Sequence, residues 1–214
     1  MKSNEFIIEG TNKQLKKLAK KYEMESEDFK TMQEIVNIGK NCKPYLNQVN
    51  NPLSLLRGID GVEDTVIKKR IRLDNRQPLG MSKKTQQILN NYFEENFNAP
   101  FRFSMLCTGN MSLADNFGYP YVVFPIGDFK FLWSSKIEDI NDVMWENDLD
   151  GQEIPITRLL NNANYRTTDI NAAIASNNEI MIRANGYYGI RVSHMRNEFP
   201  PKLVLKLLKI GMKL

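Results

Sequence analysis

A carboxylate at the start of an apolar run is the first feature of this chain that could do chemistry. Glu179 follows three short polar residues, Ser176, Asn177 and Asn178, and opens the run 180–182. Because successive side chains of a strand face opposite sides, Glu179 can face a cleft while the isoleucines of the run face the core. A carboxylate placed in this way can stabilise positive charge on a bound molecule. The alternative is a glutamate on an edge strand that faces water.

An arginine inside an apolar run is the second such feature. Arg57 and Gly58 end the run 53–59, which predicts a short strand. A buried guanidinium is costly without an anionic partner, and a phosphate or carboxylate ligand would supply one. Gly58 would let a ligand approach the main chain closely. The alternative is an arginine at a strand end on the surface.

Several common kinds of site are poorly supported. The chain has a single histidine, His194, which argues against histidine-based metal centres and catalytic triads. Neither a phosphate-binding GxxxxGK[ST] loop nor a dinucleotide-binding GxGxxG motif occurs. Glu94 and Glu95 are adjacent on an expected helix and cannot share one face, so paired acid and base catalysis by them is not expected. No metal is expected.

The composition is that of a globular domain. The 214 residues are 42% hydrophobic and 25% charged, with a formal net charge of +4. Cys42 and Cys107 are far apart and lack metal-binding or redox spacing, which favours free thiols in a reducing compartment. The sequence has no signal-peptide pattern and no apolar run of the roughly 18 residues that span a bilayer. A cytoplasmic protein without membrane contact is expected.

The amino-terminal part is predicted to be a helical arm over residues 1–48, followed by a domain over residues 49–214. Two helices are expected at 12–22 and 26–39, and Ser26 is the expected amino-terminal cap of the second. Lysines fill the outer face of the first helix, where they could bind phosphate or an acidic partner or simply face solvent. Prolines and asparagines between residues 42 and 52 indicate the boundary.

The remaining pattern alternates short strands with helices, which predicts the α+β class. Strands are expected at 53–59, 66–73, 101–108, 119–126 and 129–133. Helices are expected at 82–97, capped by Ser82, at 111–117, 137–145 and 155–164, and from a Thr168 or Asp169 cap to residue 175. Residues 176–192 are expected to form a two-stranded hairpin around Asn185-Gly186, with Glu179 opening the first strand. Residues 202–214 fit a strand or a helix.

The linear order of these parts resembles the mono-ADP-ribosyltransferases of the arginine–serine–glutamate class, which include bacterial toxins and bacteriophage enzymes. The resemblance covers roughly residues 50–195. It rests on Arg57-Gly58 at a first strand, on Cys107-Thr108-Gly109 before a small helix, and on Asn177-Asn178-Glu179 at a late strand. It implies a split β-sandwich that binds NAD and transfers ADP-ribose to a macromolecule.

The resemblance also implies a role for each matched residue. Glu179 would stabilise the positive ribose that forms when nicotinamide leaves, and Arg57 would bind the pyrophosphate of NAD. Further implied catalytic and cofactor-binding positions are Asn177, Thr108, Gly58, Cys107, Gly109, Phe117 and Phe129. Ser176, Asn177 and Asn178 would read the acceptor. Phe117 and Phe129, together with Tyr121, are also ordinary core residues.

The chain departs from the family pattern at three positions. Cys107 and Gly109 stand where the family has serines, and Asn177 stands where it has glutamate or glutamine. A thiol is a weaker hydrogen-bonding group than a hydroxyl, and an amide cannot act as a base. Asn177 is closer to the glutamine variants, which act on acceptors other than arginine.

The expected acceptor is a host protein in a bacterial cytosol, and a nucleic acid is the alternative. Three other functions stay open: an NAD glycohydrolase, an NAD-binding domain without transferase activity, and a non-enzymatic interaction protein. The last could bind nucleic acid through the basic stretch Lys68 to Arg76 and the lysine-rich arm.

Overall fold

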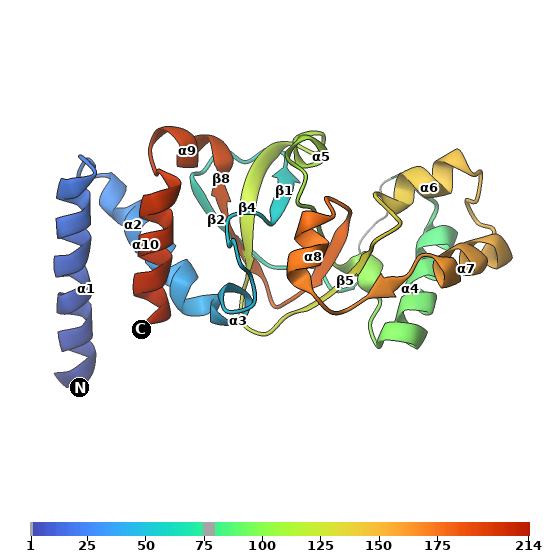
Figure 1. The fold of residues 1–214 in the computed structure, drawn as a ribbon, viewed down its shortest axis with the longest axis horizontal. Coiled ribbons are helices and arrows are strands. Elements are labelled where there is room, and N and C mark those ends of the chain that lie inside the picture. Colours follow the sequence, from blue (N-terminus) through green and yellow to red (C-terminus); the bar gives the residue numbers. More distant parts are fainter. Residues whose placement is uncertain (1, 75–79) are drawn as a thin grey trace.

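The structure, a computed structural model, describes residues 2–74 and 80–214, with side chains from residue 10 onward. Two four-stranded sheets form its centre, and every strand pair is antiparallel. Helices cover both ends of the molecule (Figure 1). The expected α+β class is therefore confirmed.

Strands far apart in the sequence build each sheet. The first sheet has the order β1-β4-β8-β2 and consists of β1 (Leu56–Ile59), β4 (Tyr119–Pro125), β8 (Tyr187–Arg191) and β2 (Val66–Lys69). The second has the order β3-β7-β5-β6 and consists of β3 (Met105–Cys107), β7 (Ile180–Arg183), β5 (Lys130–Ser134) and β6 (Tyr165–Arg166). A bridge between Leu56 and Thr108, with N···O distances of 2.8 and 2.9 Å, joins β1 to the end of β3. The expected arginine strand and Cys-Thr-Gly strand thus meet.

The helices fall into two end groups and a middle group (Figure 1). At one end lie α1 (Lys2–Lys21), α2 (Asp28–Asn41), α3 (Lys43–Leu46), α9 (Val192–Asn197) and α10 (Pro201–Met212). At the other end lie α4 (Lys83–Phe97), α6 (Ile140–Glu146) and α7 (Glu153–Asn162). Between them are α5 (Met111–Asp115), α8 (Ile170–Ala175) and the 3-10 turn η1 (Phe101–Phe103).

Helix α2 belongs to the same hydrophobic core as the first sheet. Its buried residues join those of α10, β4 and β8 in one cluster, and the Cys42 thiol that follows it lies 3.5 Å from the Phe124 carbonyl oxygen. Glycines allow the close crossing of α2 and α10, because a Cβ on Gly39 would lie 2.2 Å from the Leu208 carbonyl oxygen. The helical segment is therefore fastened to the strands at its second helix.

The predicted hairpin at Asn185-Gly186 is wrong. Strand β7 pairs with β3 and β5, whereas β8 pairs with β2 and β4, so the two strands lie in different sheets. Neither turn residue has the positive φ that a tight Asn-Gly hairpin requires. Gly186 instead packs closely on the Lys69 carbonyl oxygen, and its own carbonyl accepts a hydrogen bond from Ile126 N at 2.9 Å. The dipeptide carries the chain from one sheet to the other.

Signals within one helix predicted the structure more reliably than the signal for strand pairing did. Ser82 and Asp169 cap α4 and α8 as predicted, by accepting hydrogen bonds from Thr85 N and Ala172 N. Ser26 does not cap α2, which begins after Glu27. Residues 101–103 are a 3-10 turn rather than strand, β2 ends at residue 69, and α10 is helical. The first helix extends back from residue 12 to residue 2.

Candidate functional site

A cavity of about 490 Å³ lies beside the junction of β1 and β3. Its lining comes mainly from β1, the end of β2, η1, β3 and α5, with single residues from α4, α6 and β8 and the residue before β7. The structure brings six of the predicted site residues together here, namely Arg57, Gly58, Cys107, Thr108, Phe117 and Glu179. Cavities of this size are typical of small-molecule sites, which span roughly 300–1,000 Å³.

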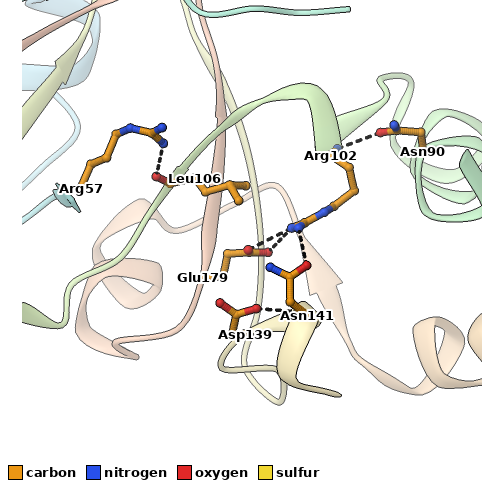
Figure 2. Close-up of polar contacts among 7 residues, drawn as sticks. All are labelled: Arg57, Asn90, Arg102, Leu106, Asp139, Asn141 and Glu179. Atoms are coloured by element: carbon orange, nitrogen blue, oxygen red, sulfur yellow. Dashed lines mark hydrogen bonds and ion pairs between the residues drawn. The ribbon is translucent and has the colours of Figure 1, made fainter. Parts of the chain in front are cut away.

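Glu179 is a buried carboxylate held by a buried arginine. Its two oxygens lie 2.7 and 2.9 Å from Nη1 of Arg102, and the two side chains are only 7% and 5% exposed (Figure 2). The main-chain N–H of Glu179 donates to the Glu138 carbonyl at 2.7 Å. The position is therefore not that of a solvated edge-strand glutamate, which was the alternative interpretation.

Arg102 is a site residue that the sequence interpretation missed. Its Nη2 donates to Oδ1 of Asn141 at 3.2 Å, and its main-chain N–H donates to Oδ1 of Asn90 at 2.8 Å. The Asn141 N–H in turn donates to Oδ1 of Asp139 at 2.7 Å, so α4, η1 and α6 all orient the ion pair (Figure 2). The sequence contains the signal that selected Arg57, because Phe101-Arg102-Phe103 also places an arginine within an apolar run.

Arg57 is half-buried and anchored to the neighbouring strand. Its Nη1 donates to the Leu106 carbonyl at 2.7 Å (Figure 2), while its buried Nε has no hydrogen-bond partner among the described residues. A buried donor without a partner costs about 1–3 kcal/mol. The protein therefore leaves one donor of the Arg57 guanidinium unsatisfied among the described residues.

The excess of positive charge in the cavity favours an anion. Five basic side chains line it, against the three acids Asp60, Asp139 and Glu179. Besides Arg57 and Arg102, the basic residues are Lys69, Arg70 and Arg72. These last three belong to the stretch that was considered for nucleic-acid binding, whose Arg76 lies outside the described residues. The basic stretch therefore contributes to the cavity wall.

Thr108 positions the loop before Glu179 rather than the carboxylate. Its hydroxyl donates to the Asn177 carbonyl at 2.8 Å and accepts from Asn110 N at 3.0 Å. Cys107 is buried and lies opposite Ile180 in the β3–β7 register. Cys107 and Thr108 therefore hold β7 and the loop before Glu179 in place at the edge of the cavity.

The loop 176–178 lies outside the cavity lining. Asn177 is exposed and has a left-handed backbone, with φ of 63°. Ser176 Oγ accepts from Asn178 N at 3.2 Å, and Asn178 Nδ2 donates to the Ser134 carbonyl at 2.8 Å. Ser176 and Asn178 thus hold the turn, and the exposed Asn177 side chain is free to contact a larger molecule beside the cavity.

The predicted glycines and aromatic residues divide between the cavity and the core. Gly58 is needed because a Cβ there would lie 2.0 Å from the Ala114 carbonyl oxygen of α5, and Gly109 similarly packs on α8. Phe117 is 54% exposed at the cavity wall. Phe129 does not line the cavity, because it packs against Tyr45 and Phe131.

The described part of the chain contains neither a metal-binding cluster nor a membrane-spanning helix. Within it, no group of three or more His, Cys, Asp or Glu residues is placed to hold a metal ion. Among the helices of residues 2–74 and 80–214, none is long and apolar enough to cross a bilayer.

Comparisons with known proteins gave no match. Neither the family models, nor the curated proteins, nor the solved structures contain a match to this chain.

Proposed function

We propose that the chain is a mono-ADP-ribosyltransferase with a split β-sandwich fold, which moves ADP-ribose from NAD to a macromolecular acceptor and releases nicotinamide. The observation that carries the proposal is that Arg57 and the buried Glu179, from segments more than a hundred residues apart, line one cavity with an excess of positive charge. The meeting of β1 with β3, and of β3 with β7, supports the same family resemblance.

Each end of the cavity suits one part of this chemistry. NAD carries a pyrophosphate, and arginine offers a planar set of donors for phosphate oxygens. Cleavage of the bond between nicotinamide and ribose develops positive charge on the ribose, which a carboxylate stabilises in a site that excludes water. The guanidinium of Arg102 keeps the Glu179 carboxylate fixed, so little reorganisation is needed when that charge appears.

The acceptor would approach beside the cavity, at the exposed Asn177. Thr108 ties the main chain of Asn177 to β3, which would hold this loop at a constant distance from Glu179. A protein acceptor in a bacterial cytosol is the proposed partner. If water reaches the ribose instead, the same cavity would act as an NAD glycohydrolase.

Transfer of label from adenylate-labelled NAD into a bacterial lysate tests the proposal. The wild-type chain should label a component that protease treatment removes, and Glu179→Gln should lower turnover by on the order of 10² or more, the effect of losing one electrostatic stabiliser. The exposed Glu95→Gln is the matched control and should keep full activity.

Binding of NAD is measured separately by calorimetry. Arg57→Ala should weaken NAD binding by on the order of tenfold or more, since a charge-assisted hydrogen bond contributes about 1.5–3 kcal/mol. Release of nicotinamide without labelling would identify a glycohydrolase. A folded wild-type chain that neither binds NAD nor releases nicotinamide would refute the proposal.

A further inference from the structure

A second hollow lies between α1 and α10, at the end of the molecule formed by the helical arm (Figure 1). Its volume is about 630 Å³, and it shares no residue with the cavity that contains Glu179. We call it the arm groove. Its lining comes from α1, from α10 and from the two residues that follow α10.

Lysines line both walls of the arm groove. Lys17 and Lys21 come from α1, while Lys206, Lys209 and Lys213 come from α10 or directly follow it. Their spacings of three and four residues place each set on one helix face. No Asp or Glu is among the described residues that line the groove, and none of these lysines forms an ion pair with a described carboxylate. Among the described residues, the charged side chains that line the groove are therefore all positive.

The lysines at the groove affect the pKa of the neighbouring Tyr22. Lys206 Nζ donates to the Tyr22 hydroxyl at 3.0 Å and lies 5.2 Å from the centre of its ring. The hydrogen bond from Lys206, followed by the charges of Lys206, Lys21 and Lys202, lowers the pKa of Tyr22. Such a surface attracts a polyanion.

The arm groove also has an apolar part. Leu18 of α1 and Ile210 of α10 line it and are partly buried against the main hydrophobic core, and Leu214 lines it with 39% of its surface exposed. A groove that combines partly buried apolar side chains with lysines suits an amphipathic helix of opposite charge.

The chemistry of the lining disfavours nucleic acid. Single strands are bound by aromatic rings that stack on bases, and base edges are read mainly by arginine, asparagine and glutamine. Among the described residues that line the arm groove, Gln14 is the one side chain of these kinds, and none is aromatic or an arginine. We propose that the arm groove binds an acidic amphipathic helix of a partner protein, with the apolar face of that helix on Leu18 and Ile210 and its carboxylates towards the lysines.

Fluorescence anisotropy with the full chain tests this proposal. The probe is a labelled designed peptide of about 18 residues, helical, with leucines on one face and glutamates elsewhere. A second peptide of identical composition, with the leucines scattered around the helix, keeps the charge and removes the apolar face. A single-stranded oligonucleotide of equal charge is the third probe. The amphipathic peptide should bind at least about tenfold more tightly than either of the others.

Matched variants locate the binding. Lys209→Glu with Lys213→Glu should weaken the amphipathic peptide by about tenfold or more, because two attractions become two repulsions. Lys84→Glu with Lys130→Glu makes the same change in net charge at exposed positions outside the groove and should change binding less than twofold. Leu214→Ser should weaken the peptide a few-fold without altering the charge. All variants should keep the wild-type unfolding transition.

Three results would overturn the proposal. The first is the absence of peptide binding to the folded wild-type chain at concentrations up to about 1 mM. A dissociation constant of that size corresponds to a binding free energy of roughly 4 kcal/mol. The second is equal weakening by both double variants, which would indicate a response to net charge alone. The third is binding of the scattered peptide or the oligonucleotide as tightly as the amphipathic peptide, which would make the groove a general polyanion surface.

Discussion

The ion pair between Arg102 and Glu179 should be worth more to the fold than a surface ion pair. Both side chains are at least 93% buried, and one guanidinium nitrogen contacts both carboxylate oxygens at 2.7 and 2.9 Å. Arg102→Met would leave the Glu179 carboxylate buried without this cation. Removal of one member of a buried pair costs about 3–5 kcal/mol, because the remaining charge loses the counter-charge that it was buried with.

The other single variant should cost somewhat less. Glu179→Gln leaves the Arg102 guanidinium buried without its anionic partner, although the amide oxygen can still accept from it, so we expect a loss of about 3 kcal/mol, the lower end of that range. The double variant, Arg102→Met with Glu179→Gln, leaves no isolated charge. Its loss of stability should therefore be smaller than the sum of the two single losses by about 2 kcal/mol or more. For a chain of this length, 1 kcal/mol corresponds to roughly 2–4 °C in the thermal midpoint.

Urea unfolding followed by circular dichroism measures these free energies, and calorimetry measures the midpoints. Arg183→Met is the matched control, because Arg183 is half-buried and donates to the Pro100 carbonyl at 3.0 Å without forming an ion pair with a described residue. Its loss should stay below about 1.5 kcal/mol, the contribution of an ordinary hydrogen bond. Additive losses for Arg102 and Glu179, within about 0.5 kcal/mol, would show that the two side chains are not coupled and would refute the reasoning.

Two further predictions concern stability away from the cavity. Gly39→Ala should destabilise the fold by about 1–3 kcal/mol, because its Cβ would meet the α10 main chain at 2.2 Å, whereas Gly10→Ala in α1 should stabilise it by about 0.5–1 kcal/mol, because nothing lies within 4 Å. Equal effects in urea unfolding would contradict the close crossing of α2 and α10. Burial raises the pKa of Cys42 to about 12, so above about pH 9 the unfolded thiol loses its proton while the native one keeps it. The free energy of unfolding should consequently fall by roughly 2–3 kcal/mol between pH 9 and pH 11. Cys42→Ala should show a shallower fall across the same titration. Identical curves for the two chains would mean that Cys42 is not held as a neutral thiol.

The local parts of the fold could be predicted from the sequence, and the pairing of its strands could not. Ser82 and Asp169 act within three residues of their own helices, so their roles follow from local chemistry. The run 180–182 is apolar on both faces, and all three of its side chains are buried. Such a run gives no alternation to show which strand it pairs with, and the Asn-Gly signal then indicated the wrong partner.

The candidate site shows the same division. Arg57 and Glu179 could be selected because each is a charge at the end of an apolar run. Arg102 carries the same signal, but it was overlooked. The partner of Arg102 could not be deduced, because the contact between residues 102 and 179 depends on how η1 and the start of β7 come together in the fold. Gly58 was assigned to a ligand, although the main chain of α5 already requires it. A sequence indicates that a position cannot hold a side chain, but not which neighbour forbids it.

The position of β2 has a consequence for how the chain must be made. Strand β2 pairs within its sheet only with β8, which follows it by more than a hundred residues, and α2 packs on the still later α10. During synthesis, the apolar face of α2 and the edge of β2 therefore stay exposed until residues beyond 187 have left the ribosome. Contacts of such separation fold slowly and expose aggregation-prone surfaces meanwhile. The chain should depend on chaperones while it is being made, and fragments that stop before β8 should be degraded or aggregate.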